Sequence, residues 1–160
     1  MTPILISKGK LEEVLDSVNF ILNKNKLLTL STVDEKNNSP CSSTAFFCFD
    51  ENFNIYIWTS EDTTHGRNIE ENNKVAVNIF DSSQKWGTRL QGLQIKGRAS
   101  KTSGNELLVG GALYLKRFLD AKSLIKNIQD FNSKKLESKL YKISIDFIKI
   151  FDENKFGKEK

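Results

Sequence analysis

Side chains that can hold an anion are concentrated in the segment from Trp58 to Arg67. A strand-like stretch ends there in hydroxyl residues and passes into a short stretch with helical spacing. Free backbone N–H groups at the start of a helix attract an anion. Hydroxyl groups add neutral hydrogen bonds, and imidazole or guanidinium groups add positive charge. The segment is typical of a phosphate site, and its candidate ligands are Thr59, Ser60, Thr64, His65 and Arg67.

An ordinary loop explains the same spacing, so both interpretations stay open on composition alone. In that case Thr63 is the N-cap of the helix and Arg67 lies in solvent. Two acidic residues, Glu61 and Asp62, also oppose an anion unless they point away from it.

His65 is the only histidine, which excludes an acid–base pair of two histidines within one subunit. Haem ligation would depend on His65 or on a ligand of another type. The two cysteines, Cys41 and Cys48, lie on one predicted strand, and their odd spacing directs them to opposite faces. We therefore expect two reduced thiols and no metal site.

The composition is that of one globular domain over 1–160, with 38% hydrophobic and 28% charged residues. The 24 basic and 20 acidic residues are scattered without a long block of like charge, and no nucleic-acid-binding motif is present. The N-terminus lacks a basic region followed by an apolar one, and no apolar run approaches the length of a membrane span. We expect a cytoplasmic protein that binds neither nucleic acid nor a membrane.

Apolar periodicity predicts the elements that must position the 58–67 segment. Helical spacing from Leu11 to Leu22 predicts an amphipathic first helix, and a short helix is predicted over 63–71. Runs of β-branched and aromatic residues predict six strands at 27–33, 41–49, 53–59, 75–80, 90–101 and from Leu140 onward.

A helical insertion is predicted before the last strand. Ser103 and Glu106 have capping-box spacing, and a second short helix would carry Leu124, Ile125 and Ile128. The apolar stripe of the first helix of the insertion would consist of Leu107, Leu108, Gly111, Ala112, Leu115, Phe118 and Leu119.

The last strand has an irregular apolar pattern. Residues Tyr141 to Phe147 alternate on one side, and then the pattern slips, which a bulge near Asp146 explains. Because most connections are too short for the crossovers of a parallel sheet, we expect a mainly β, six-stranded antiparallel barrel, closed or partly closed.

Several motifs, taken in order, resemble the pyridoxamine 5'-phosphate oxidase-like FMN-binding split-barrel superfamily. The similarity runs from the first helix to the last strand, and the order and spacing of the motifs carry it. Matches at 44–50, 92–97 and 156–158 resemble a small, poorly characterised, single-domain branch. The main motifs are Tyr-Ile-Trp-Thr-Ser, Thr-Thr-His-Gly-Arg-Asn-Ile-Glu-Glu-Asn and Val-Ala-Val-Asn-Ile-Phe.

The resemblance implies a homodimer with one FMN in each of two clefts between the subunits. It assigns the phosphate to Thr59, Ser60, Thr64 and His65, with Arg67 as a helper. It also implies that the second strand lines the flavin ring through Ser43, Thr44 and Ala45. Trp58 would directly precede the phosphate-binding threonine, and Gln94 and Lys96 of the long strand would lie near the cofactor.

The departures from the family pattern limit what is carried over. Many members have Arg-Lys where this sequence has Thr64-His65, so we expect weaker FMN binding that falls at high pH. The C-terminal substrate-binding segment of true pyridoxamine-phosphate oxidases has no counterpart here, and we do not expect that activity. The sequence predicts an FMN-dependent oxidoreductase for an unknown small substrate. The alternatives are a flavin storage or sensing protein, or a haem or deazaflavin binder on the same barrel.

Overall fold

Six antiparallel strands close into a barrel in the order β1-β2-β3-β6-β5-β4, in a computed structural model that describes residues 8–158. This confirms the predicted mainly β architecture and the number of strands. The strands are β1 (Leu27–Asp34), β2 (Ser39–Phe49), β3 (Ile55–Ser60), β4 (Lys74–Phe80), β5 (Gln91–Lys101) and β6 (Ser138–Asp152).

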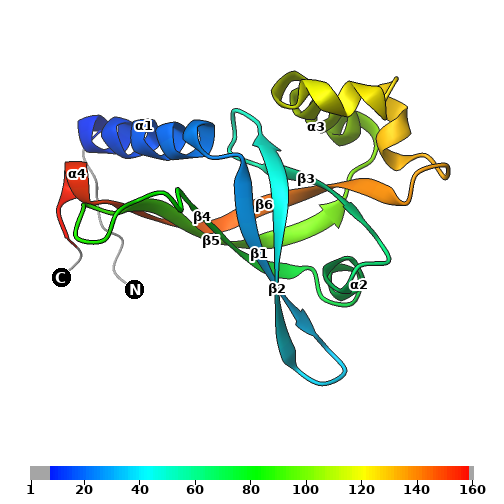
Figure 1. Ribbon diagram of the computed structural model, residues 1–160, viewed down its shortest axis with the longest axis horizontal. Helices are drawn as coiled ribbons and strands as arrows, with labels where there is room; N and C mark the ends of the chain where they lie inside the picture. The colour runs from blue at the N-terminus through cyan, green and yellow to red at the C-terminus, as the bar shows by residue number, and fades with distance from the viewer. Residues whose placement is uncertain (1–7, 159–160) are drawn as a thin grey trace.

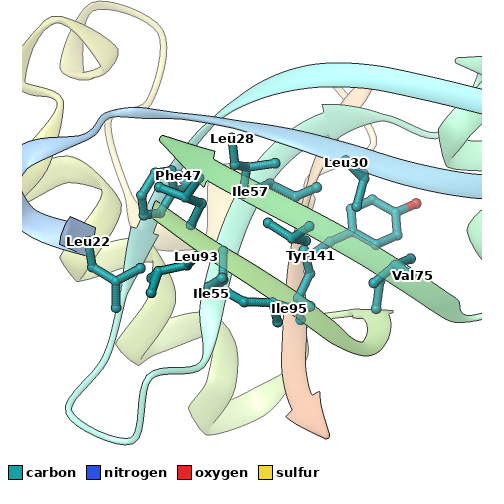
Figure 2. Close-up of a cluster of buried hydrophobic side chains, with 14 of the residues drawn as sticks. Leu22, Leu28, Leu30, Phe47, Ile55, Ile57, Val75, Leu93, Ile95 and Tyr141 are labelled. Carbon is teal, nitrogen blue, oxygen red and sulfur yellow. The ribbon is translucent and has the colours of Figure 1, made fainter. Parts of the chain in front are cut away.

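Alternating side chains fill the interior of the barrel. On β1 the inward residues Leu28 and Leu30 are buried, and on β3 Ile55 and Ile57 occupy the same space. Figure 2 shows these side chains together with Phe47 from β2 in one buried cluster. Burying a large apolar side chain contributes about 1.5–3 kcal/mol, so this cluster supplies much of the stability.

A bulge in β6 changes which side chains face inward. The pairing with β5 shifts register between Lys96 and Gly97, whose partners are Phe147 and Ile145, so Asp146 is the extra residue. A Cβ at Gly97 would lie 2.4 Å from the carbonyl oxygen of Ser144, so only glycine fits against the bulged backbone. The bulge is confirmed.

Phe147 lies on the other side of the sheet from the predicted one. The inward residues before the bulge are Tyr141, Ile143 and Ile145, and Phe147 comes after the extra residue, so its ring faces outward and is 54% exposed.

Helices cover the barrel from several sides (Figure 1). The first, α1 (Lys8–Lys24), lies against β4, β5 and β6, while the short α2 (Thr64–Glu71) lies beside β1. α3 (Gly104–Arg117) packs on β2 and β6, and Arg117 at its end donates to the carbonyl oxygen of Leu22 in α1 at 2.8 Å. The chain also forms two 3-10 helices, η1 (Leu119–Ser123) and η2 (Ile128–Asn132), and a final turn of helix, α4 (Glu153–Phe156).

The helical insertion differs in detail from its prediction. Ser103 is the N-cap of α3, but within the described chain its side chain makes no capping hydrogen bond. Glu106 instead pairs with Lys142 of β6 at 2.7 Å. Leu124 and Ile125 lie between η1 and η2 rather than on a second α-helix. The Glu106 side chain therefore forms an ion pair with β6 instead of a capping hydrogen bond at the start of α3.

The buried face of α3 is centred on glycine and tyrosine. Leu108, Ala112 and Leu119 of the predicted stripe are exposed, whereas Gly110, Gly111 and Tyr114 are buried. A Cβ on Gly110 would lie 2.3 Å from the ring of Tyr56, so glycine allows the helix to approach β3 closely. The predicted stripe did not include Gly110 and Tyr114 because it was drawn through mainly aliphatic residues, whereas the helix packs on an aromatic cluster.

That second apolar cluster lies outside the barrel, between α3 and the sheet. It contains Cys48, Tyr56, Tyr114, Ile125, Phe131 and Leu140, with Trp58 packed against it. Burial raises the pKa of the Cys48 thiol to about 12, and Cys41 is the other free thiol. In the part of the chain that the structure describes, no helix is both long and apolar enough to cross a membrane.

Candidate functional site

The turn between β3 and α2 is built by side-chain hydrogen bonds. Thr63 is the N-cap of α2, and its hydroxyl accepts from the backbone N–H of Gly66 at 3.0 Å while donating to the carbonyl oxygen of Ser60 at 2.8 Å. The Ser60 hydroxyl accepts from the N–H of Asp62 at 3.2 Å. Gly66 has no room for a side chain, since a Cβ there would lie 2.4 Å from the Ser60 carbonyl oxygen.

His65 is held against the end of β3. Its Nε2 lies 2.6 Å from the hydroxyl oxygen of Thr59. Burial lowers the pKa of the imidazole below its ordinary value of 6.5, so the ring is neutral at pH 7. A neutral imidazole and a hydroxyl thus form one hydrogen-bonding unit in the first turn of α2.

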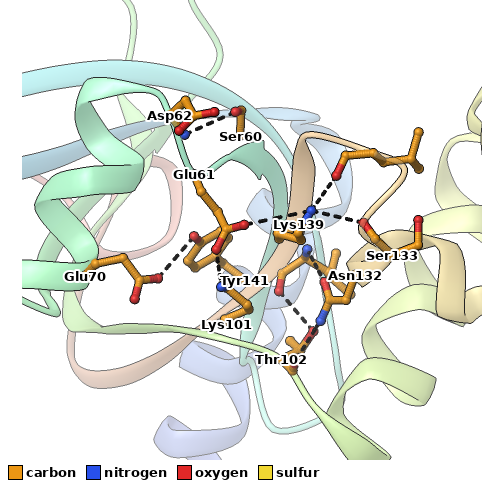
Figure 3. Close-up of polar contacts among 12 residues, drawn as sticks. Ser60, Glu61, Asp62, Glu70, Lys101, Thr102, Asn132, Ser133, Lys139 and Tyr141 are labelled. Carbon is orange, nitrogen blue, oxygen red and sulfur yellow. Dashed lines mark hydrogen bonds and ion pairs between the residues drawn. The ribbon is translucent and has the colours of Figure 1, made fainter.

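Glu61 points away from that unit, toward two lysines. Figure 3 shows its carboxylate directed at Lys101 of β5 and Lys139 of β6. The hydrogen bond from Lys101 lowers the pKa of the carboxyl group, and Lys139 lies 3.8 Å from its second oxygen. Glu61 is therefore neutralised on the β5–β6 side of the turn.

The other predicted phosphate ligands of this turn are accessible. Thr64 and Arg67 are exposed on the first turn of α2. The guanidinium of Arg67 donates to the backbone carbonyl of Asp62, which holds it over the turn. The structure thus brings Thr59, Ser60, Thr64, His65 and Arg67 together in one turn.

The three predicted residues of β2 divide between the two sides of the strand. Ala45 packs against the barrel core, and the Ser43 hydroxyl donates to the carbonyl oxygen of Leu30 at 3.4 Å. Thr44 alone points outward, opposite Thr29 of β1. Only the backbone of Ser43 and Ala45, together with the Thr44 side chain, is available on the outer face.

Gln94 and Lys96 both lie on the outer face of β5, as predicted from the polar alternation. They line a hollow of about 320 Å³ together with Ser31, Ala76 and Phe147. A second hollow of about 670 Å³ shares Ser31, Ala76 and Lys96 with the first. We call the two hollows together the outer trough, which crosses β1, β4 and β5.

The sequence interpretation missed several residues of the outer trough. Asn78 of β4 lies between Thr29 of β1 and Gln94 of β5 in the strand register. The Lys96 ammonium lies 6.0 Å from the centre of the Phe147 ring. The signal for Asn78 was present, because it is a polar residue between the inward Val77 and Ile79 of an apolar strand.

Trp58 does not join the other candidates. Its indole packs edge-on against Tyr114 and Phe131 in the cluster beneath α3, at centroid distances of 6.3 and 5.6 Å. Successive strand residues face opposite sides, so Trp58 and Thr59 diverge. The structure assigns Trp58 to packing of the insertion.

Comparison with known proteins places this geometry in a family. Residues 14–138 match the family model described as pyridoxamine 5'-phosphate oxidase. The chain belongs to the pyridoxamine 5'-phosphate oxidase family. The match begins in α1 and ends at the first residue of β6, so it includes the β3–α2 turn and the β1, β4 and β5 walls of the outer trough.

Proteins of similar sequence include a UPF0306 protein of Pasteurella multocida, 36% identical over 99 residues. That match covers 61% of this chain and 63% of the relative, so it spans less than two thirds of the relative's length.

Solved structures share the family fold at low sequence identity. Protein Atu2129 of Agrobacterium tumefaciens superposes with a TM-score of 0.73 at 19% identity, covering 94% of this chain and 61% of that one. A haem-binding protein of Mycobacterium smegmatis gives 0.70 at 16% identity, covering 92% and 55%.

Proposed function

We propose that the protein binds FMN in a cleft between two copies of the chain and acts as an oxidoreductase on a small substrate. The observation that carries this proposal is the Thr59–His65 unit in the first turn of α2, with Glu61 neutralised by two lysines. Family membership supports the same cofactor.

The β3–α2 turn suits a phosphate group. The start of α2 offers backbone N–H groups, Thr59 and Thr64 offer hydroxyls, and Arg67 offers a fixed positive charge. Because His65 is neutral in the free protein, we propose that the phosphate is held by hydrogen bonds more than by charge. Affinity is then lower than with an Arg-Lys pair.

The outer trough suits a flat ring system. Its floor carries the polar side chains of Ser31, Asn78 and Gln94, and Phe147 forms an aromatic edge. A trough that is open along one side buries only one face of a flat ligand, whereas ligand sites usually enclose most of the ligand surface. We propose that a second copy supplies the missing wall.

Exposed apolar side chains support such a dimer. Leu27 and Phe46 are paired across β1 and β2, and they are 46% and 52% exposed on the outer face. Phe80 of β4 is 44% exposed. Large apolar side chains gathered beside a polar site are typical of a protein interface.

A bound flavin supplies the redox chemistry by accepting and donating hydride or single electrons. The chain's own residues anchor the phosphate at the β3–α2 turn, present polar groups along the trough and exclude water from one face. No protein nucleophile is required. The shape and the lining of the cleft select the electron donor and the substrate.

Haem is the second candidate, because a protein of this fold is described as haem-binding. The single histidine argues against it, since His65 Nε2 is already engaged with Thr59 at 2.6 Å. A flavin storage or sensing role uses the same site without turnover.

An absorption spectrum of the purified protein, before and after addition of FMN, separates these candidates. Flavin bands and quenched flavin fluorescence support the proposal, whereas a Soret band or indifference to added FMN contradicts it. Anaerobic mixing with NADH or NADPH then tests turnover, because an oxidoreductase that uses either donor bleaches the bound flavin. Light scattering with and without FMN tests the dimer.

A further inference from the structure

The side-chain amide of Asn78 is incompletely satisfied. Its Oδ1 is shielded from solvent and accepts no hydrogen bond from any residue within 8–158. Asn78 is on the central strand of the trough, with Thr29 on one neighbouring strand and Gln94 on the other. The residue lines the hollow of about 320 Å³.

A shielded, unpartnered carbonyl oxygen is costly and therefore uncommon. Most buried polar side-chain atoms have a hydrogen-bond partner, and each exception calls for an explanation. No hydrogen bond joins either end of the amide to another residue within 8–158, so the described chain does not fix its orientation. A leucine of similar size would avoid the cost entirely, so folding alone does not account for an asparagine here.

The amide can offer an acceptor and a donor side by side. Asparagine χ2 is a broad torsion, so the amide plane can turn until either end faces the hollow. Gln94 presents a second amide directly across the β4–β5 pairing, and its side chain is exposed. Two amides on paired positions of neighbouring strands match a ligand that alternates acceptor and donor along one edge.

We infer that Asn78, with Gln94 beside it, binds the imide edge of a flat heterocycle, the –CO–NH–CO– edge that a flavin ring carries. This rests on the proposed function and deepens it, because it names the part of the ring that is recognised. The Asn78 oxygen accepts from the imide N–H, and its amino group donates to an adjacent carbonyl. A porphyrin has no such edge, so the pair also selects flavin over haem.

Chemical modification of the flavin tests this directly. In FMN methylated at the imide nitrogen, a methyl group replaces the hydrogen that FMN is inferred to donate to Asn78. The wild type should bind FMN roughly tenfold more tightly than the methylated form, the loss expected for one buried hydrogen bond. Asn78→Leu should bind the two flavins equally, at the weaker affinity.

Stability of the flavin-free protein separates binding from a structural role. Asn78→Leu removes an unpartnered buried oxygen, so its melting temperature should equal or exceed that of the wild type. A lower melting temperature would show that the amide stabilises the fold and would overturn the inference. Asn105→Leu, which removes an exposed amide on α3, is the matched control and should leave flavin discrimination unchanged.

The outcomes also distinguish the two levels of the proposal. Failure of the wild type to bind either flavin removes both the proposed function and this inference. Binding of FMN without discrimination against the methylated form, or discrimination that persists in Asn78→Leu, removes the inference alone.

Discussion

The hydroxyl oxygen of Thr59 lies 2.6 Å from Nε2 of His65, and this contact joins the end of β3 to the first turn of α2. Thr63 caps the same turn at the backbone. The turn is therefore held by two separate sets of bonds, and the Thr59–His65 contact can be exchanged for ligand contacts while the helix start stays in place.

Replacing both residues of this contact should weaken phosphate binding. We expect Thr59→Val with His65→Ala to reduce FMN affinity by about 2 to 4 kcal/mol, because two contacts to the phosphate are lost. Calorimetric titration measures this, with riboflavin as the ligand control because it has no phosphate. Thr88→Val, at an exposed loop position, is the protein control. Equal FMN affinity in the double variant and the wild type would contradict the phosphate assignment.

FMN affinity should rise as the pH falls from about 8 to 6.5. Burial lowers the pKa of His65 in the free protein, so the ring is neutral there, and a nearby phosphate favours its charged form. Binding then takes up a proton and is favoured at lower pH. Titrations across this range measure the slope, and His65→Gln should flatten it. A slope that is unchanged in His65→Gln would assign the proton uptake to another group.

Stability of the flavin-free protein should depend on pH in the opposite sense. The folded-state pKa of His65 is depressed, so the unfolded chain binds more protons once the pH falls below about 6.5. The contribution of the neutral ring is fully present above that value and is lost as the pH falls toward the folded pKa. Urea unfolding of the wild type and His65→Gln measures the difference, which should be confined to acidic pH.

Removing the charge of Glu61 should affect binding more than folding. Glu61 is one of the two acidic residues of the turn, beside Asp62, and it is paired with Lys101 and Lys139. Glu61→Gln leaves these cations without their partner, which makes the turn more positive and should raise FMN affinity a few-fold. The cost in stability should stay below about 1 kcal/mol, since such pairs are partly exposed. Lower FMN affinity in this variant would contradict the expectation that the Glu61 carboxylate opposes the phosphate.

Helix α3 should not tolerate a methyl group at its contact with β3. Gly110→Ala places a Cβ 2.3 Å from the ring of Tyr56, and overpacking of this kind costs about 1–3 kcal/mol. Gly9→Ala on α1 is the matched control, because among the described residues a Cβ there meets nothing within 4 Å. The control should be neutral or stabilising, by up to about 1 kcal/mol. Equal unfolding free energies for the two variants would contradict the close packing.

The barrel and its element order were predictable because strands such as β1, β4 and β5 alternate inward apolar residues with more exposed ones. The β3–α2 turn was predictable for a similar reason, since Thr63, Gly66 and the hydroxyl residues act through local contacts. Trp58 and the insertion were not, because their positions depend on aromatic contacts with Tyr114 and Phe131 that are distant in the chain. Local spacing carries no information about such contacts.

Composition could not separate the two faces of β2 and β6. Ser43 and Thr44 are chemically alike, yet one bonds to the barrel wall and the other points outward. Phe147 and Ile148 are both apolar, and only the register shift opposite Lys96 and Gly97 decides which of them faces the interior.

The single extra residue at Asp146 decides which side chains of the second half of β6 face the core and which face the trough. Deleting it would turn Phe147 inward and Ile148 outward, so the aromatic edge of the trough and one wall of the core would be exchanged in a single step. After the bulge, Phe147 belongs to the outer face, whereas Ile148 and Ile150 still pack against the barrel core. A substitution of Phe147 can therefore change the aromatic edge of the trough while Ile148 keeps its place in the core.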